Sequence, residues 1–170
     1  MQHAILYGEH ELTLDLKNRV ILPSDIRKSL IPERDGNAFF LVVGQNRKPW
    51  LYTEKYYQHL VSSGEQHLMP NEDVLAFNQI HFAMASLVEW DKQWRMLLPD
   101  KTLKRTGIGR EVTLIGARDH LELWNRADWE RRFEELFGRS EAIMLKAQLA
   151  LQRERASQGE RAQQHDEHGG

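Results

Sequence analysis

The hydrophobic pattern divides the chain into four stretches. Residues 8–60 and residues 84–137 consist of short apolar runs separated by turn-forming residues, which is typical of strands joined by turns. Between them, residues 71–82 carry apolar side chains at helical spacing, and another helical pattern begins within residues 139–170. The pattern therefore predicts two β-rich regions joined by a helix, and after them a C-terminal helix with a polar tail.

The two β-rich regions are copies of one pattern. Both contain an Asp-x-x-x-Arg frame, at residues 15–19 and 91–95, and each frame is followed by three apolar residues and a proline. A helix-capping residue, Ser24 or Asp100, comes directly after each proline and predicts a short helix. Two further blocks repeat: Phe39–Gly44 matches Glu111–Gly116, and Leu51–Thr53 matches Leu123–Asn125. A repeat of this extent sets the expected fold of the whole chain.

Each copy is predicted to form strand, turn, strand, short helix, strand, turn and strand, and then a longer helix capped by Thr53 or Asn125. A unit of about 50 residues leaves too much apolar surface exposed to be stable alone. The two copies are therefore expected to share one core, as an intramolecular pseudo-dimer of the α+β, β-rich class.

Two helices are expected outside these copies. Asn71 is a capping candidate for a connecting helix over residues 71–82. Ser140 can cap a C-terminal helix that extends to about Gln152. Residues 153–170 are rich in Gln, Arg, Glu, His and Gly without periodicity, so we expect a disordered tail there.

Composition narrows the function classes. The 170 residues include no cysteine, which excludes disulfides, thiol nucleophiles and zinc sites built on thiolates. The longest apolar run, Ala38–Val43, is far shorter than the roughly 20 residues of a membrane-spanning helix. With 23 Lys and Arg against 25 Asp and Glu, the net charge is −2. Small nucleic-acid-binding domains are often strongly basic, so binding to DNA would have to come from local charge.

The duplicated frame has a chemical interpretation. Asp15 can accept hydrogen bonds from the amides of the turn and orient the guanidinium of Arg19. Arg19 and Lys17 would then project from a hairpin, where a forked donor suits phosphate oxygens or the O6/N7 edge of guanine. A single Asp–Arg pair of this kind is more often an ordinary turn salt bridge. Two pairs in the same structural position favour a functional role.

These residues resemble the MraZ family, bacterial transcriptional regulators built from two SpoVT-AbrB-type repeats. The resemblance covers about residues 8–137 and rests on the two frames, the Ile-Leu-Pro and Leu-Leu-Pro segments, and Leu-Glu-Leu-Trp-Asn followed by Trp129. It implies two swapped-hairpin, double-psi-type units, at residues 8–60 and 84–137, assembled into a ring-shaped homo-oligomer. It also implies binding to double-stranded DNA at short G-rich direct repeats, upstream of the division and cell-wall gene cluster that includes its own gene, usually with repression.

The resemblance also assigns candidate site residues. The motif arginine, credited with DNA contact in the family, corresponds to Arg19 and Arg95. The remaining matches are the acidic positions Asp15 and Asp91, and Lys17 at the basic position of the commonest family form. A ring would bring many copies of these basic residues to one face of an acidic protein, and it would add multivalency.

The residue before each motif arginine departs from the family, which usually has Gly where the turn needs positive φ. Asn18 tolerates that conformation, but a bulky aromatic at Trp94 is costly there. The second turn, in which Lys92 stands one position before the neutral Gln93, is therefore expected to be differently shaped or no longer to contact DNA. We expect the first repeat to dominate DNA contact and Trp94 to be a packing or subunit-contact residue.

Other functions have weaker support. The sequence contains no nucleotide-binding glycine motif, nucleophile elbow or recognisable set of metal ligands, so no enzyme activity, cofactor, metal or small-molecule substrate is expected. The alternative is a protein-interaction or antitoxin-like module with the same fold, supported by a stripe of apolar residues over 143–151 that would bind a partner. The start of the chain has no secretory signal pattern, and a cytoplasmic, nucleoid-associated protein is expected.

Overall fold

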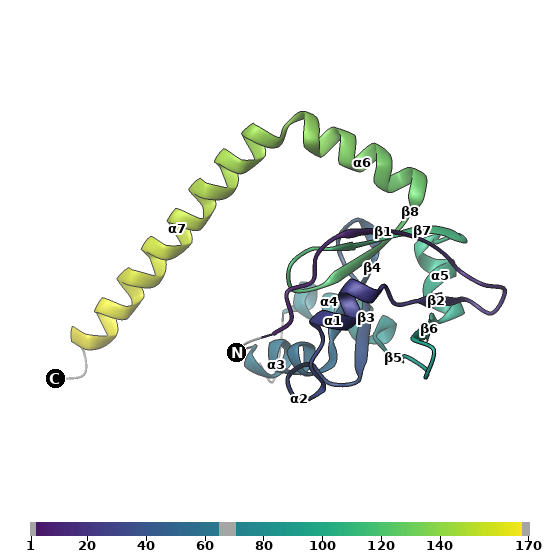
Figure 1. Ribbon diagram of the computed structural model, residues 1–170. Coiled ribbons are helices and arrows are strands. Elements are labelled where there is room, and N and C mark those ends of the chain that lie inside the picture. Colours follow the sequence, from purple (N-terminus) through teal and green to yellow (C-terminus); the bar gives the residue numbers. More distant parts are fainter. Residues whose placement is uncertain (1–2, 65–70, 168–170) are drawn as a thin grey trace. The chain divides into compact units, whose positions relative to one another are not determined.

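The computed structural model describes the backbone of residues 3–64 and 71–167, and side chains as far as residue 156 (Figure 1). The chain divides into two compact units, Met1–Trp129 and Glu130–Gly170. The first unit contains every β-strand found in the described residues. The second unit is helical.

The elements of the first copy occur in the predicted order. They are β1 (Glu9–Thr13), β2 (Arg19–Ile21), α1 (Ser24–Ser29), α2 (Pro32–Asp35), β3 (Ala38–Val43), the 3-10 turn η1 (Gln45–Arg47), β4 (Pro49–Thr53) and α3 (Glu54–Ser63). After α4 (Glu72–Met84), the second copy contributes β5 (Ser86–Glu89), β6 (Arg95–Leu97), α5 (Asp100–Thr106), β7 (Glu111–Gly116), β8 (Leu121–Asn125) and α6 (Arg126–Gly138). The last element is α7 (Ser140–Glu167).

The strands of the two copies are intermixed. Six of them form one sheet in the order β1-β7-β8-β4-β3-β5, and β2 pairs with β6 in a separate two-stranded ribbon, with every pairing antiparallel. The first strand of each copy thus pairs with the third strand of the other copy, as β1 with β7 and β5 with β3. The predicted α+β, β-rich class is confirmed.

One hydrophobic core contains residues from both copies. Val20 and Met96 face each other across the β2–β6 ribbon, and both are buried. Phe39 on β3 and Leu123 on β8 are completely buried in the same core. Burying each such side chain contributes about 1.5–3 kcal/mol before chain entropy is counted. The core therefore holds the two copies together.

Contacts between side chains of the two copies also join them at the β4–β8 pairing. Lys48 Nζ lies 4.9 Å from the centroid of the Trp124 ring and 3.2 Å from Asp128 Oδ2. The equivalent position in the other copy is His120, whose ring stacks on Trp50 at 4.1 Å. Burial lowers the pKa of His120, but hydrogen bonds to its two neighbouring carboxylates, 2.8 and 3.3 Å away, raise it above its ordinary value. In each copy, therefore, the residue at this position lies on an aromatic ring of the other copy.

The predicted helix caps are only partly right. Asn71 caps α4 by accepting a hydrogen bond from the Val74 amide at 2.9 Å, as expected. Ser24 and Asp100 were expected to cap the short helices but are their first helical residues, and the cap positions are prolines. The fixed φ of proline suits this extended position before the helix. Thr53 occupies the cap position of α3 without making a side-chain cap bond.

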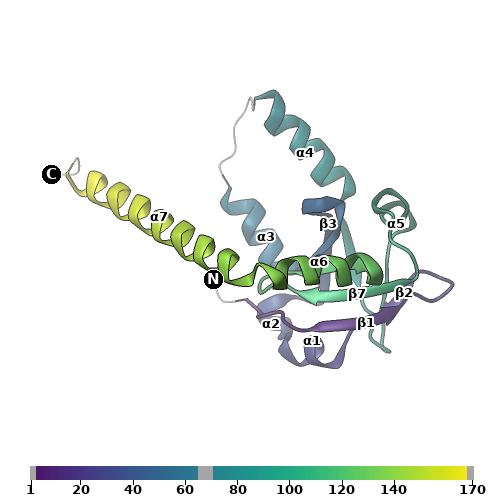
Figure 2. The same ribbon diagram turned by 90° about the horizontal axis from the view of Figure 1, so that it is seen from above.

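The C-terminal helix is longer than predicted. It continues to Glu167 rather than ending near Gln152, so the expectation of a disordered tail from residue 153 is wrong as far as residue 167 (Figure 2). The segment is rich in Gln, Arg, Glu and Ala, which favour helix even without an apolar stripe. The rest of the expected tail, residues 168–170, lies outside the described residues. No helix in the described part of the chain is long and apolar enough to cross a membrane.

Candidate nucleic-acid interface

The first candidate turn, residues 15–19, is organised by one carboxylate. Asp15 Oδ1 accepts hydrogen bonds from the amides of Lys17, at 2.8 Å, and Arg19, at 2.9 Å. Its Oδ2 accepts a third bond from Arg19 Nε at 2.7 Å. The backbone closes the turn, because the Asp15 amide donates to the Arg19 carbonyl at 2.9 Å. Asp15 therefore fixes both the turn and the direction of the arginine.

The second turn, residues 91–95, repeats this arrangement. Asp91 Oδ1 accepts from the amides of Gln93, at 2.8 Å, and Arg95, at 3.0 Å, and its Oδ2 accepts from Arg95 Nε at 2.8 Å. The Asp91 amide donates to the Arg95 carbonyl at 3.0 Å. The side chains of Arg19 and Arg95 are almost equally exposed, at 31% and 32%. The two frames are thus the same structure built from different intervening residues.

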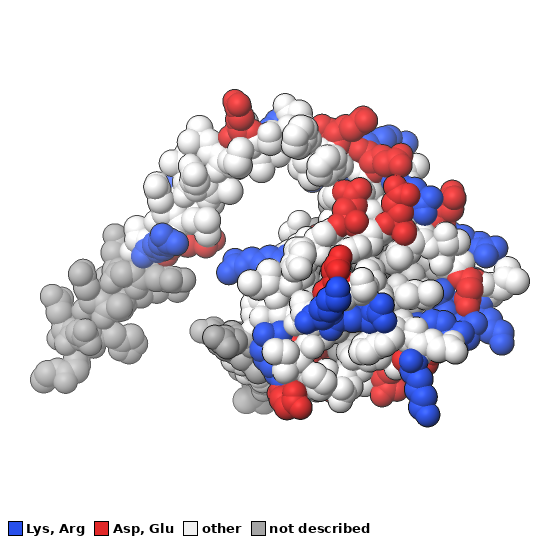
Figure 3. All heavy atoms as spheres, in the orientation of Figure 1, with Lys and Arg blue, Asp and Glu red and all other residues white. Residues whose placement is uncertain are grey.

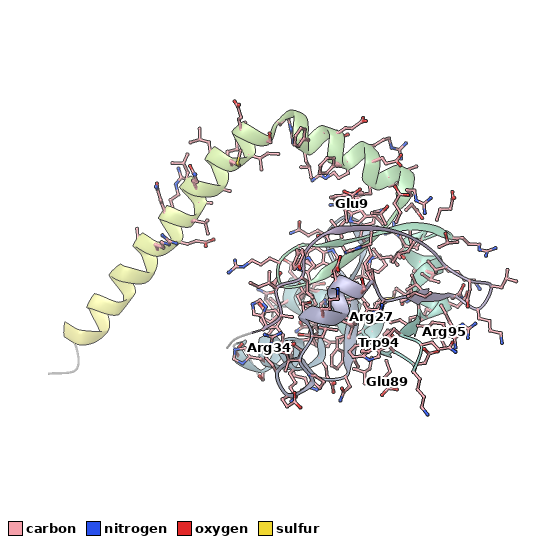
Figure 4. All side chains as sticks on the ribbon, in the orientation of Figure 1. Glu9, Arg27, Arg34, Glu89, Trp94 and Arg95 are labelled. Carbon is pink, nitrogen blue, oxygen red and sulfur yellow. The ribbon has the colours of Figure 1, made fainter. Side chains whose placement is uncertain are left out.

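Of the two alternatives expected for the second turn, a different shape is wrong, whereas loss of contact with DNA stays a prediction. Asn18 has φ 58° and Trp94 has φ 61°, so both residues adopt the left-handed conformation. The cost of this conformation for Trp94 is offset by packing. Its ring stacks on Trp90 at 5.8 Å between centroids, and Arg27 Cζ lies 5.4 Å from the centroid of the Trp94 ring (Figure 4).

Hydrogen bonding keeps both aspartates ionised. The backbone and side-chain hydrogen bonds of Arg95 lower the pKa of Asp91 to about 2. The pKa of Asp15 is also lowered, chiefly by the Arg19 amide, against an opposing effect of burial. Both arginines bond to their aspartates through Nε, at 2.7 Å in the first turn and 2.8 Å in the second.

The β2–β6 ribbon connects the two turns. Because its strands are antiparallel and each turn leads directly into one of them, the turns lie at opposite ends of the ribbon. The ladder continues beyond the strands, since the Leu22 amide donates to the Trp94 carbonyl at 2.8 Å and the Leu98 amide to the Asn18 carbonyl at 3.0 Å. In Figure 3, Lys and Arg side chains gather on the right-hand edge, where Figure 1 shows the β1–β2 turn.

The remaining predicted site residues lie within the same two turns. Lys17 and Lys92 are exposed within the two turns, and Asn18 is half-buried. Arg27 on α1 was not predicted, yet it lies against Trp94 from the other copy, and its Nε is buried without a hydrogen-bond partner in the described residues. Comparison of the two copies in the sequence could have singled out Arg27, because the equivalent position in the second copy holds the apolar Leu103. Among the described residues, no group of His, Asp and Glu side chains is arranged to hold a metal ion.

Comparison with known proteins identifies relatives of this chain. Residues 81–153 match the family model described as “MraZ protein, putative antitoxin-like”. The protein named Transcriptional regulator MraZ from Acetivibrio thermocellus is 32% identical over 126 residues, which cover 74% of this chain and 85% of that protein. Proteins of the same name from Clostridium tetani and from the Alaska E43 strain of Clostridium botulinum are 31% and 32% identical, over 72% of this chain and 83% and 82% of their own lengths.

These relatives are matched over most of their length and over more than two thirds of this chain. The level of identity and the coverage are sufficient to assign the family. The chain belongs to the MraZ family, whose relatives named above are transcriptional regulators.

Proposed function

We propose that this protein is a transcriptional regulator that binds double-stranded DNA specifically through its two Asp-x-x-x-Arg turns. Its proposed targets are short G-rich direct repeats in the promoter of its own division and cell-wall gene cluster, which it represses. It acts as a ring-shaped homo-oligomer, in the cytoplasm and associated with the nucleoid. The function requires no enzyme activity, cofactor, metal, membrane or small-molecule substrate.

The observation that supports this proposal is the equivalence of the two turns. Arg19 and Arg95 are each oriented by an aspartate and half-exposed at the ends of one ribbon. A rigid guanidinium fork at a protruding edge suits paired acceptors, such as phosphate oxygens or guanine O6 and N7. Lys17 and Lys92 add exposed positive charge beside them, and Asn18 adds a small polar side chain.

The arrangement of the strands supports the proposed repeat structure. Residues 8–60 and 84–137 form two swapped-hairpin, double-psi AbrB-type units in an intramolecular pseudo-dimer, with residues 71–82 as the connecting helix and residues 139–170 as an appended segment. Exchange of strands between the copies, β1 to β7 and β5 to β3, is what such a swapped pair requires. Assembly into a ring would repeat the basic turns on one face and so counter the net charge of −2.

A DNA titration tests the proposal. Wild-type protein and Arg19→Ala are titrated, at two salt concentrations, against duplex DNA from directly upstream of the gene and against a scrambled duplex. The wild type should prefer the upstream duplex in a salt-sensitive manner, and Arg19→Ala should lose that preference. Arg139→Ala, which removes an exposed arginine outside the turns, is the matched control and should retain it. Equal, weak binding of all three proteins to both duplexes would overturn the proposal.

A second candidate function is a protein-interaction or antitoxin-like module. Helix α7 exposes large apolar side chains that would bind a partner: Met144, Leu145, Leu149 and Leu151. Deleting residues 139–170 and measuring the mass in solution distinguishes this candidate from self-assembly. An unchanged number of subunits would show that the helix is not needed for assembly, which would favour a different protein as its partner.

A further inference from the structure

The outer face of the β2–β6 ribbon is unusual in composition. Side chains alternate between the two faces of a strand, and Val20 and Met96 occupy the buried face. The opposite face therefore carries one arginine and one aliphatic residue from each strand: Arg19, Ile21, Arg95 and Leu97. Ile21 is 56% exposed and Leu97 is 59% exposed, although a branched aliphatic side chain gains free energy from burial.

The register pairs each arginine with an aliphatic side chain. Arg19 lies opposite Leu97, and Ile21 lies opposite Arg95. The flanking positions, Asn18 with Leu98 and Leu22 with Trp94, are joined by backbone hydrogen bonds. Since hydrogen-bonded and non-hydrogen-bonded pairs alternate, the two arginine–aliphatic pairs are of the non-hydrogen-bonded kind, in which side chains approach most closely.

The spacing of these pairs matches the spacing of bases. The two arginine–aliphatic pairs are two residues apart along the strands, which corresponds to about 6.6–6.8 Å. Two base-pair steps of B-DNA occupy about 6.8 Å along the helix axis. A two-stranded ribbon is also one of the elements that the major groove of B-DNA admits.

The positive charge around this face favours DNA, rather than an apolar protein surface, as its binding partner. The two aliphatic side chains lie between two arginines, and exposed Lys17 and Lys92 lie in the turns at the ends of the ribbon. The two aspartates of the turns are already bonded to the arginines and the turn amides. This face therefore complements a polyanion that also presents apolar groups, which in the major groove are the C5-methyl groups of thymine.

We infer that Ile21 and Leu97 contact thymine methyl groups in the major groove, next to the bases or phosphates that bind Arg19 and Arg95. This inference rests on the proposed DNA-binding function and extends it from charge to base recognition. The recognised element then contains thymines beside the groups contacted by the arginines, about two base-pair steps apart. Neither aliphatic residue is needed for the fold, because both are largely exposed.

Replacement of thymine by deoxyuridine tests the inference, since it removes only the methyl group. Wild-type protein is titrated against the upstream duplex with its thymines intact and with each thymine replaced in turn. Replacement of a contacted thymine should weaken binding about fourfold per methyl group. The double variant Ile21→Ala, Leu97→Ala should bind the thymine and deoxyuridine duplexes equally. Leu87→Ala, which removes an exposed aliphatic side chain from β5, should behave as wild type.

The outcomes separate this inference from the proposed function. Selective, Arg19-dependent binding that no deoxyuridine weakens would overturn the inference and leave the proposed function intact. The inference would also be overturned if deoxyuridine still weakened DNA binding by the double variant. A changed mass of the double variant in solution, together with unchanged DNA binding, would overturn it as well. Absence of any preference of the wild type for the upstream duplex over a scrambled one would overturn the proposed function and, with it, this inference.

Discussion

The turns at residues 15–19 and 91–95 have the same geometry but different sequences. In both, an aspartate accepts hydrogen bonds from two amides and from the Nε of an arginine four positions later. The residue before the arginine is asparagine in one turn and tryptophan in the other, yet φ differs by only a few degrees, 58° against 61°. The aspartate network, rather than the conformational preference of that one residue, therefore determines the shape of the turn.

The side chains that the turns present are nevertheless different. Trp94 packs inward against Trp90 and Arg27, whereas the equivalent Asn18 is small and polar. The residue before Asn18 is the charged Lys17, whereas the residue before Trp94 is the neutral Gln93. These side chains, and not a difference in backbone shape, are the basis for ranking the first turn above the second.

The largest expected effect concerns the two arginines. Arg19→Ala should weaken binding to the upstream duplex by about 10- to 100-fold, which is the range for loss of a good bidentate contact. Arg95→Ala should weaken it less, by about three- to tenfold, because the neutral Gln93 lies in its turn at the position that Lys17 occupies in the first turn. Fluorescence anisotropy with both variants at the same salt concentration measures the difference. Equal losses would show that the two turns contribute equally, contrary to the ranking.

A smaller effect concerns the stability of the second turn. Trp94→Ala should lower the free energy of unfolding by about 1–2.5 kcal/mol through loss of the contacts to Trp90 and Arg27. Trp94→Gly loses the same contacts but avoids the left-handed strain, so it should be more stable than Trp94→Ala by about 1 kcal/mol. Urea unfolding measures both variants. Asn18→Gly and Asn18→Ala are the matched pair in the first turn and should show the same order. A Trp94→Ala variant at least as stable as Trp94→Gly would contradict the assigned strain.

The smallest expected effect concerns the pKa of Asp91. The pKa of Asp91 is about 2, below the ordinary value near 3.9, so its contribution to stability is present above pH 4 and is lost as the pH falls through 2. Arg95→Gln should raise this pKa but leave it below the ordinary value, because the amides of residues 93 and 95 still donate to the carboxylate. Carboxyl-carbon NMR titration measures both proteins. An ordinary pKa for Asp91 in the wild type would contradict the turn geometry.

Much of the fold could be predicted from the sequence because its signals are local. Short apolar runs between turn-forming residues predict the strands, and Asn71 predicts the start of the connecting helix. The roles of Asp15 and Asp91 as organisers of the turns also follow from their spacing to the arginines. Each of these features depends on residues within one turn or one strand, so a single sequence is sufficient.

Other features depend on distant residues and could not be predicted. The pairing of β1 with β7 and of β5 with β3 is a choice among strands that have similar local patterns. The packing of Trp94 involves Arg27, which lies in the other copy. The end of α7 was predicted wrongly for a different, local reason: residues 153–167 are polar and lack periodicity, but many of them favour helix.

The most direct test of the central claim is the DNA preference of a double variant, Arg19→Ala with Arg95→Ala. Its affinity for the upstream duplex and for a scrambled duplex is compared with that of the wild type at one salt concentration. If the two oriented arginines recognise DNA, the wild type prefers the upstream duplex, and the double variant binds both duplexes with the same weak affinity while its thermal unfolding remains cooperative. A double variant that keeps the wild-type preference for the upstream duplex would contradict the account.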